Sequence, residues 1–234
     1  MSLTRVVEET VEPTLNAAVF RRIRADIISC RLMPNERLRI EALRERYNVG
    51  GSPIREALMR LQAETLVELE QNKGFRVASV SREQLIDVMR MRREIEGIAL
   101  RWSIENADVE WEANLVSAFH RLSRQSKIDA DDGTIDPNWS KEHRAFHAAL
   151  AAACGSPMLL NMRNGLFDQA ARYVALSVMS RAIRRNDIAE HEQIMQAALS
   201  RDVARAVNHN SRHIDSTTEK VLKSLVPQVR SANS

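Results

Sequence analysis

Residues Glu36–Val67 read ERLRIEALRERYNVGGSPIREALMRLQAETLV and hold two short amphipathic segments separated by a glycine turn. In the second segment, apolar residues recur at the spacing of one helix face, namely Ile54, Ala57, Leu58 and Leu61. In the first segment, Ile40, Leu43 and Tyr47 share a face in the same way. The two segments are therefore predicted to be helices that fold across each other.

The turn and the start of the second helix have residues suited to those positions. Asn48, Gly50 and Gly51 allow a tight turn. Ser52 is expected to cap the second helix, and Pro53 suits its first position because proline there loses no hydrogen bond.

The outer face of the second helix is basic and rich in hydrogen-bonding groups, and it carries Arg55, Met59, Arg60 and Gln62. A helix pair with such a face is the arrangement that places a recognition helix in the major groove of DNA. The alternative is an ordinary helical hairpin, and the flanking sequence favours DNA binding.

The flanking residues predict a winged helix over residues 15–80. A helix is expected from Leu15 to Ser29, before the pair. After the pair, VELEQNKGFRVASV (residues 67–80) alternates in character and predicts a β-hairpin in which Gly74 takes a positive φ. Lys73 stands at the tip of this wing, where it can reach the minor groove or a phosphate.

The chain beyond Val80 has helical patterns only, so the predicted fold is mainly α, with an N-terminal winged helix-turn-helix and a C-terminal all-helical bundle. Ser81 and Gln84 form a capping box. Helices are expected at about 82–105, 109–125, 138–153, 158–180, 187–199 and 203–225, and several begin after a good capping residue: Asp108, Ser156, Asp187 and Asp202. The predicted domains are a flexible arm (1–14), the winged helix (15–80), a helical effector-binding and dimerisation domain (81–225) and a tail (226–234).

The charge distribution favours contact between the first domain and phosphate. Residues 16–80 contain 12 Lys and Arg against 8 Asp and Glu, whereas residues 81–224 contain 20 of each. The polar, acidic start is unlike a signal peptide, and no apolar run approaches the roughly 20 residues of a membrane span. The distant cysteines Cys30 and Cys154 fit buried thiols, so a cytoplasmic protein is expected.

Six histidines all lie in the second domain, and four of them fall on inward helix faces. His143 and His147 are four residues apart on one apolar face, and His191 and His213 lie on two later helices. Such histidines can converge on zinc, nickel, cobalt, iron or copper, or they can be hydrogen-bonded core residues. His209 and His213 form a second pair with the same spacing, so spacing alone does not select the ligand.

These residues carry a resemblance to a known family. The chain resembles GntR-family transcription factors of the FadR-type subgroup with an all-helical ligand-binding FCD domain, and within them the carbon-starvation regulators of the CsiR type. The motifs that carry it are RLMPNERLRIEALRERYNVGGSPIREALMRL, NKGFRV, MRMRREIEGIAL, EHRAFHAALAAACGSP, AEHEQIMQAALSRD and NHNSRHI.

The resemblance implies roles for particular residues. Arg55 would be the recognition-helix arginine, with Ser52 and Arg60 near the DNA backbone or base edges and Lys73 and Gly74 at the wing tip. The metal ligands would be His143, His147, His191 and His213, which selects His213 over His209. The metal would be a divalent transition metal, zinc first, and Arg92 and Arg172 would bind a carboxylate effector as forked donors.

The sequence departs from the family pattern at several positions. His143 stands where the family commonly has aspartate, which makes the expected site all-imidazole or three-coordinate. Gly51 replaces a frequent arginine before the recognition helix, and Asn35 and Thr65 replace common turn glycines.

The expected function is a ligand-responsive, sequence-specific regulator, a repressor that binds operator DNA as a homodimer with a small organic acid as effector and no membrane partner. One alternative is a metal-dependent enzyme with a winged-helix docking module, in which Glu142 or Glu190 is a general base. Adjacent helix residues point about 100° apart, so both glutamates are expected to face away from the metal. Another alternative is a structural helical protein whose wing binds another protein.

Overall fold

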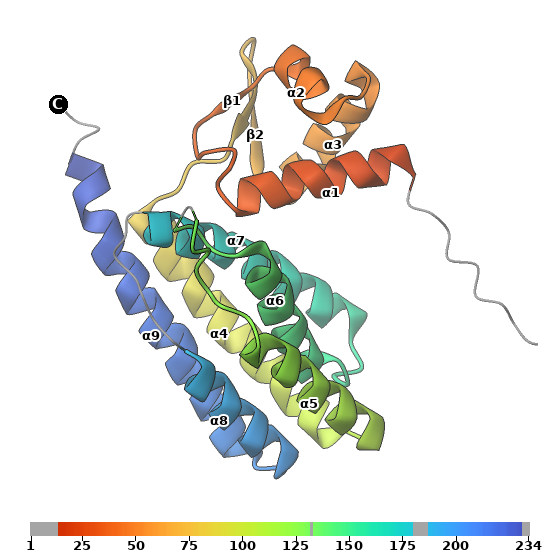
Figure 1. Ribbon diagram of the computed structural model, residues 1–234, viewed down its shortest axis with the longest axis vertical. Coiled ribbons are helices and arrows are strands. Elements are labelled where there is room, and N and C mark those ends of the chain that lie inside the picture. The colour runs from red at the N-terminus through yellow and green to blue at the C-terminus, as the bar shows by residue number, and fades with distance from the viewer. Residues whose placement is uncertain (1–13, 132, 180–186, 231–234) are drawn as a thin grey trace, which may run out of the picture. The chain divides into compact units, whose positions relative to one another are not determined.

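The structure is a computed structural model of the 234-residue chain and describes residues 14–131, 133–179 and 187–230. It divides into two compact units at Ser79 and Val80, except that Ile28–Cys30 groups with the second unit. The predicted fold class is confirmed: a winged helix-turn-helix precedes an all-helical bundle (Figure 1).

From residue 14 onward, the first unit has three helices and a three-stranded antiparallel sheet. Its elements in chain order are α1 (Leu15–Ile28), β1 (Arg37–Leu38), α2 (Ile40–Tyr47), α3 (Gly51–Ala63), β2 (Val67–Glu70) and β3 (Gly74–Val77). The strand order is β1-β3-β2, with Leu69 opposite Phe75 in the hairpin. Strand β1 was not expected, because two residues are too few to show a strand period in the sequence.

The predicted helix pair packs through the predicted apolar stripe. Ile54, Leu58 and Leu61 of α3 are fully buried, and they share one core with the inward residues of α1 and α2. Asn48 ends α2 in the left-handed conformation (φ 53°, ψ 55°) and turns the chain toward α3. The expected cap at Ser52 is wrong: α3 begins at Gly51 after Gly50, so Ser52 already lies inside the first turn.

Positive φ values mark the turns of this unit. Gly74 has φ +81°, as predicted for the wing. Asn35 and Thr65 have φ 67° and 58°, the region that favours glycine. Thr65 is β-branched, so its backbone is strained there.

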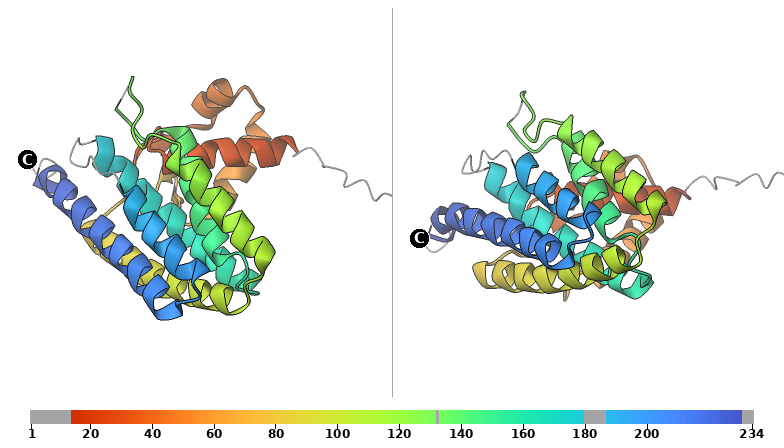
Figure 2. Two further views of the ribbon diagram at one scale, coloured as in Figure 1. Left: turned by 60° about the horizontal axis from the view of Figure 1, so that its bottom comes forward. Right: turned by 90° about the horizontal axis from the view of Figure 1, so that it is seen from below.

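The second unit is a bundle of long helices, and their observed bounds lie close to the predicted ones. They are α4 (Arg82–Glu105), α5 (Val109–Ser123), α6 (Pro137–Ala151), α7 (Pro157–Met179), α8 (Ile188–Leu199) and α9 (Val203–Arg230). Helix α4 packs between α7 and α9, α8 lies against α9, and α5 lies against α6 (Figures 1 and 2). Helix α9 runs to Arg230, five residues beyond the predicted helix end at 225: Pro227 lacks one N–H donor but does not end the helix. The last residues of the predicted tail, 231–234, lie outside the described residues.

Most predicted caps are confirmed. The hydroxyl of Ser81 accepts a hydrogen bond from the backbone N–H of Gln84 at 3.1 Å, and Asp108 accepts one from Trp111 at 2.7 Å. Ser156 and Asp202 cap α7 and α9 in the same way. Asp187 makes no side-chain cap bond; its carboxylate instead accepts a 2.6 Å hydrogen bond from Lys127.

Cys30 and Cys154 are both buried free thiols. Among the described residues, no helix combines the length and the apolar character needed to cross a membrane.

The fully buried Leu58 and the exposed Met59 provide a test of the α3 packing. Leu58→Ala should destabilise the winged helix by about 2–5 kcal/mol, because it removes core contacts and leaves a cavity. Met59→Ala, at a side chain that is 54% exposed, should change stability by less than about 0.5 kcal/mol. Hydrogen exchange of the α3 amide groups measures both; equal protection in the two variants would contradict this packing.

Candidate metal centre, buried arginine cavity and DNA-binding face

Four imidazoles converge inside the helical bundle. His143 and His147 project from α6, His191 from α8 and His213 from α9, and their candidate ligand atoms all lie within 4.8 Å of one another. His143 is half-buried and stacks on Trp139 with ring centroids 4.4 Å apart, whereas the other three are buried. His209 is not part of the cluster, and His120 is exposed and also outside it.

The cluster favours neutral imidazoles. Burial holds the pKa of His143, His147 and His191 well below the ordinary value, and the neighbouring imidazoles lower each pKa further. Lys127 also lowers the pKa of His143 and His191, and Arg92 lowers that of His143 and His147. Neutral imidazole is the form that binds a metal ion, because its unprotonated nitrogen carries the free electron pair.

Several ring nitrogens have no protein hydrogen-bond partner. Nε2 of His147 and both ring nitrogens of His191 are buried without one among the described residues. Leaving such atoms unsatisfied is costly, and a metal ion or a bound ligand would satisfy them. The donor set and the unsatisfied nitrogens therefore fit a transition metal.

A carboxylate lies beside the Nδ1 atom of three of the four histidines. The distances are 2.9 Å from His213 to Glu190, 3.7 Å from His147 to Glu96 and 3.9 Å from His191 to Asp187. A carboxylate beside Nδ1 favours the proton on that nitrogen and leaves Nε2 free for a ligand. Glu190 thus contacts the outer nitrogen of His213, while Glu142 faces away and pairs with Arg121 at 3.0 Å.

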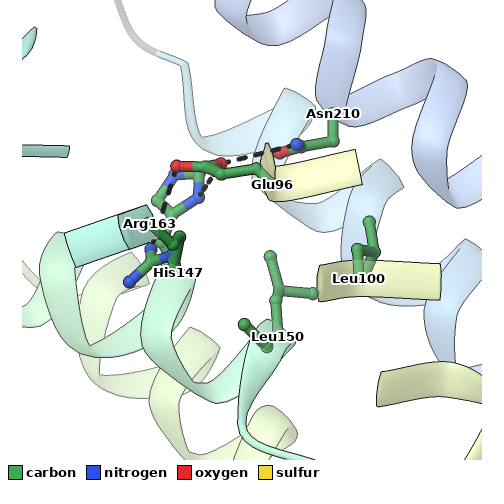
Figure 3. Close-up of a pocket in the computed structure, with 7 residues that line it drawn as sticks. Glu96, Leu100, His147, Leu150, Arg163 and Asn210 are labelled. Atoms are coloured by element: carbon green, nitrogen blue, oxygen red, sulfur yellow. Dashed lines mark hydrogen bonds and ion pairs between the residues drawn. The ribbon is translucent and has the colours of Figure 1, made fainter. Parts of the chain in front are cut away.

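Glu96 is the centre of a second, adjoining group of buried polar residues (Figure 3). Nε of Arg92 donates a 2.8 Å hydrogen bond to its carboxylate, and Nδ2 of Asn210 donates one at 3.4 Å. Nη2 of Arg163 lies 4.0 Å from the same carboxylate. Burial raises the pKa of Glu96, but Arg92 and Arg163 outweigh burial and hold the pKa below its ordinary value.

A small cavity adjoins these groups, and its lining includes the guanidinium of Arg163 and the carboxylate of Glu96. It has a volume of about 10 Å³, room for roughly one water molecule, and is lined by Glu96, Leu100, His147, Leu150, Ala151, Arg163 and Asn210. Nη2 of Arg92 and Nη2 of Arg163 are buried without hydrogen-bond partners among the described residues. Two buried guanidinium groups thus face a single carboxylate, an arrangement that favours an added anion.

Arg92 and Arg172 were predicted to bind the effector, whereas Arg163 was not among the predicted residues. Arg163 could have been found from its position on the inward stripe of α7, between Leu159 and Phe167. Arg172 is also buried, but it lies nine residues further along α7 and does not line this cavity. Its Nη1 donates a 3.3 Å hydrogen bond to Gln169.

The predicted DNA-binding residues lie on the exposed surface of the first unit. Ser52, Arg55 and Met59 share the outer face of α3. Arg60 is exposed but its guanidinium lies over the Phe20 ring, 4.1 Å from the ring centroid, on the side of α3 next to α1. Lys73 and Gly74 are exposed at the wing turn.

A winged helix with an exposed basic recognition helix, followed by a bundle with an internal polar site, is typical of a ligand-responsive transcription regulator. Comparisons with known proteins agree. Residues 15–77 match the family described as "Bacterial regulatory proteins, gntR family", and residues 87–216 match the FCD domain. The chain belongs to the GntR family of transcription regulators and carries an FCD effector-binding domain.

The relatives are transcription regulators. The chain is 38% identical over 199 residues to the HTH-type transcriptional repressor GlaR of Escherichia coli K12, covering 83% of this chain and 90% of that protein. It is also 38% identical over 209 residues to the HTH-type transcriptional regulator BphR of Paraburkholderia xenovorans LB400, covering 89% and 85%. The solved structure of Escherichia coli McbR/YncC has the same fold, with a TM-score of 0.76 at 21% identity over 90% of this chain and 98% of that one. Because these families and relatives are regulators, the metal-dependent enzyme is excluded.

Glu96 should be required for the stability of the second unit. Glu96→Gln should destabilise it by about 3 kcal/mol, because Arg92 and Arg163 lose their buried counter-charge. Glu192→Gln, at an exposed position of α8, is the control and should change stability by less than about 0.5 kcal/mol. Urea unfolding followed by tryptophan fluorescence with a chelator present isolates this unit, because Trp102, Trp111 and Trp139 all lie in it. Equal unfolding midpoints would contradict a stabilising role for Glu96.

Proposed function

We propose that this regulator is a cytoplasmic repressor of the CsiR type that binds a near-palindromic operator as a homodimer and responds to a metal ion and a small carboxylate. The observation that supports it most strongly is the convergence of four imidazoles from α6, α8 and α9 within 4.8 Å. The repressor name of the GlaR relative supports the direction of regulation.

His143, His147, His191 and His213 would hold the metal. Neutral nitrogen ligands suit zinc first, with nickel, cobalt or iron as other candidates. Glu190, Glu96 and Asp187 would orient three of these rings through their Nδ1 atoms. When bound, the metal supplies a positive centre that an effector oxygen can ligate.

Arg92 and Arg163 would provide the second point of attachment for the effector. The Nη2 atoms of both arginines have no hydrogen-bond partner among the described residues, and Arg163 lines the cavity together with His147. One carboxylate ligand could therefore contact both a guanidinium and the histidine cluster. Arg172, buried on the same helix as Arg163, is a further candidate donor. The cavity holds only about one water molecule, so an organic acid must displace the surrounding side chains.

Effector binding would thereby favour one of two arrangements of the dimer. A ligand shifts such an equilibrium only if it binds one arrangement better than the other. An effector that enters the small cavity must displace the side chains around it, and this displacement would make the effector bind one arrangement better than the other. Each winged helix would read one half-site, with Arg55 on the base edges and Ser52, Arg60, Lys73 and the backbone of Gly74 near the sugar-phosphate backbone.

The role of Arg55 in base recognition can be tested with two variants, one that removes the positive charge and one that keeps the charge but removes the forked guanidinium group. Arg55→Ala should weaken binding to specific operator DNA by about 1–3 kcal/mol if the guanidinium makes a bidentate contact with guanine. Arg55→Lys keeps the charge but loses the fork, so it should lose specific binding while keeping non-specific binding. Fluorescence anisotropy with operator and scrambled duplexes measures both. Unchanged operator affinity in either variant would remove Arg55 from base recognition.

The metal centre is tested by elemental analysis of protein purified without chelators or a histidine tag. Wild type should contain close to one transition metal ion per chain. His147→Ala should lose it, and His120→Ala should retain it because His120 is exposed and outside the cluster. Equal metal content in the two variants, or none in wild type, would contradict the proposed centre.

A further inference from the structure

Helix α4 exposes large apolar side chains in spite of its position in the bundle. Met91, Ile98 and Trp102 are 41%, 40% and 42% exposed. Exposed apolar surface bordered by charges is typical of a protein interface. Figure 2 shows α4, in yellow, along one edge of the bundle beside α9 in blue.

Met91 and Ile98 belong to a regular stripe of exposed residues. Exposed positions recur along α4 at alternating spacings of four and three residues: Asp87, Met91, Glu94, Ile98, Arg101 and Glu105. This is the spacing by which one helix packs along another helix. The inward face of α4 carries Arg92 and Glu96, so the stripe faces away from the bundle interior.

The two edges of the stripe differ in chemistry. About 100° of rotation per residue places Glu94, Arg101 and Arg90 on one side of the line from Met91 to Ile98. The same rotation places Trp102 on the other side, together with the largely buried Ile95. One edge is therefore charged with both signs, and the other is apolar.

The order of the charges is self-complementary. If a second α4 lies antiparallel with a two-fold axis between Gly97 and Ile98, residue n lies opposite residue 195 − n of the second copy. Glu94 then faces Arg101 of the second copy, and Arg90 faces Glu105 of the second copy. A two-fold contact repeats each pair. A parallel pair would instead set Glu94 against Glu94 and Arg101 against Arg101.

We infer that α4 is the dimerisation helix of this protein and that its partner is α4 of a second copy, antiparallel, with the two-fold axis between Gly97 and Ile98. The apolar edges, with Met91 and Trp102, pack together on one side of the contact, and the ion pairs form on the other. Glu94 also contacts Arg93 within its own chain at 3.2 Å, an exposed pair that leaves the carboxylate accessible. This inference rests on the proposed homodimer, and it names the surface and register that form it.

A charge-swap experiment tests the register. Glu94→Arg alone and Arg101→Glu alone each place like charges together twice in the dimer, so each should raise the dimer dissociation constant by at least about tenfold. The double variant Glu94→Arg/Arg101→Glu restores opposite charges and should return the constant to within about threefold of wild type. Sedimentation equilibrium of the full chain without DNA measures all four proteins. Singles that dimerise like wild type, or a double variant that stays dissociated, would overturn the register.

A matched pair of isoleucines on α4 tests the surface. Ile98→Glu should give a monomer, because it places two carboxylates at the two-fold axis. Ile86→Glu makes the same change at a similarly exposed residue (44%) on another face, and it should remain dimeric. Circular dichroism confirms that both variants are folded. A monomeric wild type, or the same oligomeric state in both variants, would overturn the inference.

These outcomes are independent of operator binding. A wild type that dimerises through another surface would refute the α4 contact and leave the proposed regulator intact. A protein that dimerises through α4 but ignores operator DNA would refute the proposed function and leave the α4 contact intact.

Discussion

The bundle is organised around one buried carboxylate. Glu96 of α4 lies within 4.0 Å of Arg163 of α7, 3.7 Å from His147 of α6, and accepts hydrogen bonds from Arg92 of its own helix and Asn210 of α9. A buried charge is tolerated only when opposite charges and donors surround it. Glu96 therefore fixes the relative positions of four helices at a single point, which a purely apolar contact would define less specifically.

The same carboxylate joins the histidine cluster to the arginine cavity. His147 belongs to both groups, because its ring is part of the imidazole cluster and also lines the cavity. An anion that draws Arg92 or Arg163 away from Glu96 would change the charge beside His147. Arg92 and Glu96 lie on the inner face of α4, and the exposed stripe lies on its outer face. A shift of this helix is thus a direct physical route from an occupied pocket to the proposed dimer contact.

Periodicity made most of the fold predictable, and local chemistry made part of the site predictable. The long helices and their caps could be read from spacing and from residues such as Ser81 and Asp108, since both signals are local in the chain. Strand β1 was not predicted because this two-residue strand forms only by pairing with β3, which is distant in the chain. The start of α3 was predicted too late, because Gly51 and not a residue after Ser52 begins the helix. Arg163 was missed because a charged residue on an apolar stripe is interpretable only when its distant partner, Glu96, is known. Glu190 was expected to face away from the metal because only its own helix was considered. Its contact with Nδ1 of His213 could not be predicted in this way, because His213 lies 23 positions away on α9.

The histidine at position 143 changes the charge balance of the proposed centre. An aspartate there would offset one unit of the charge of a divalent ion, whereas neutral His143 offsets none. His143 is also the one member of the cluster that is half-buried, and it stacks on Trp139, which Lys127 approaches to 4.6 Å from the ring centroid. The positive charge of the metal that an aspartate would have offset therefore stays uncompensated at His143, the most accessible side of the cluster. Four neutral ligands and the arginines beside Glu96 together favour an anionic effector over a neutral one, because an anion alone offsets the excess positive charge.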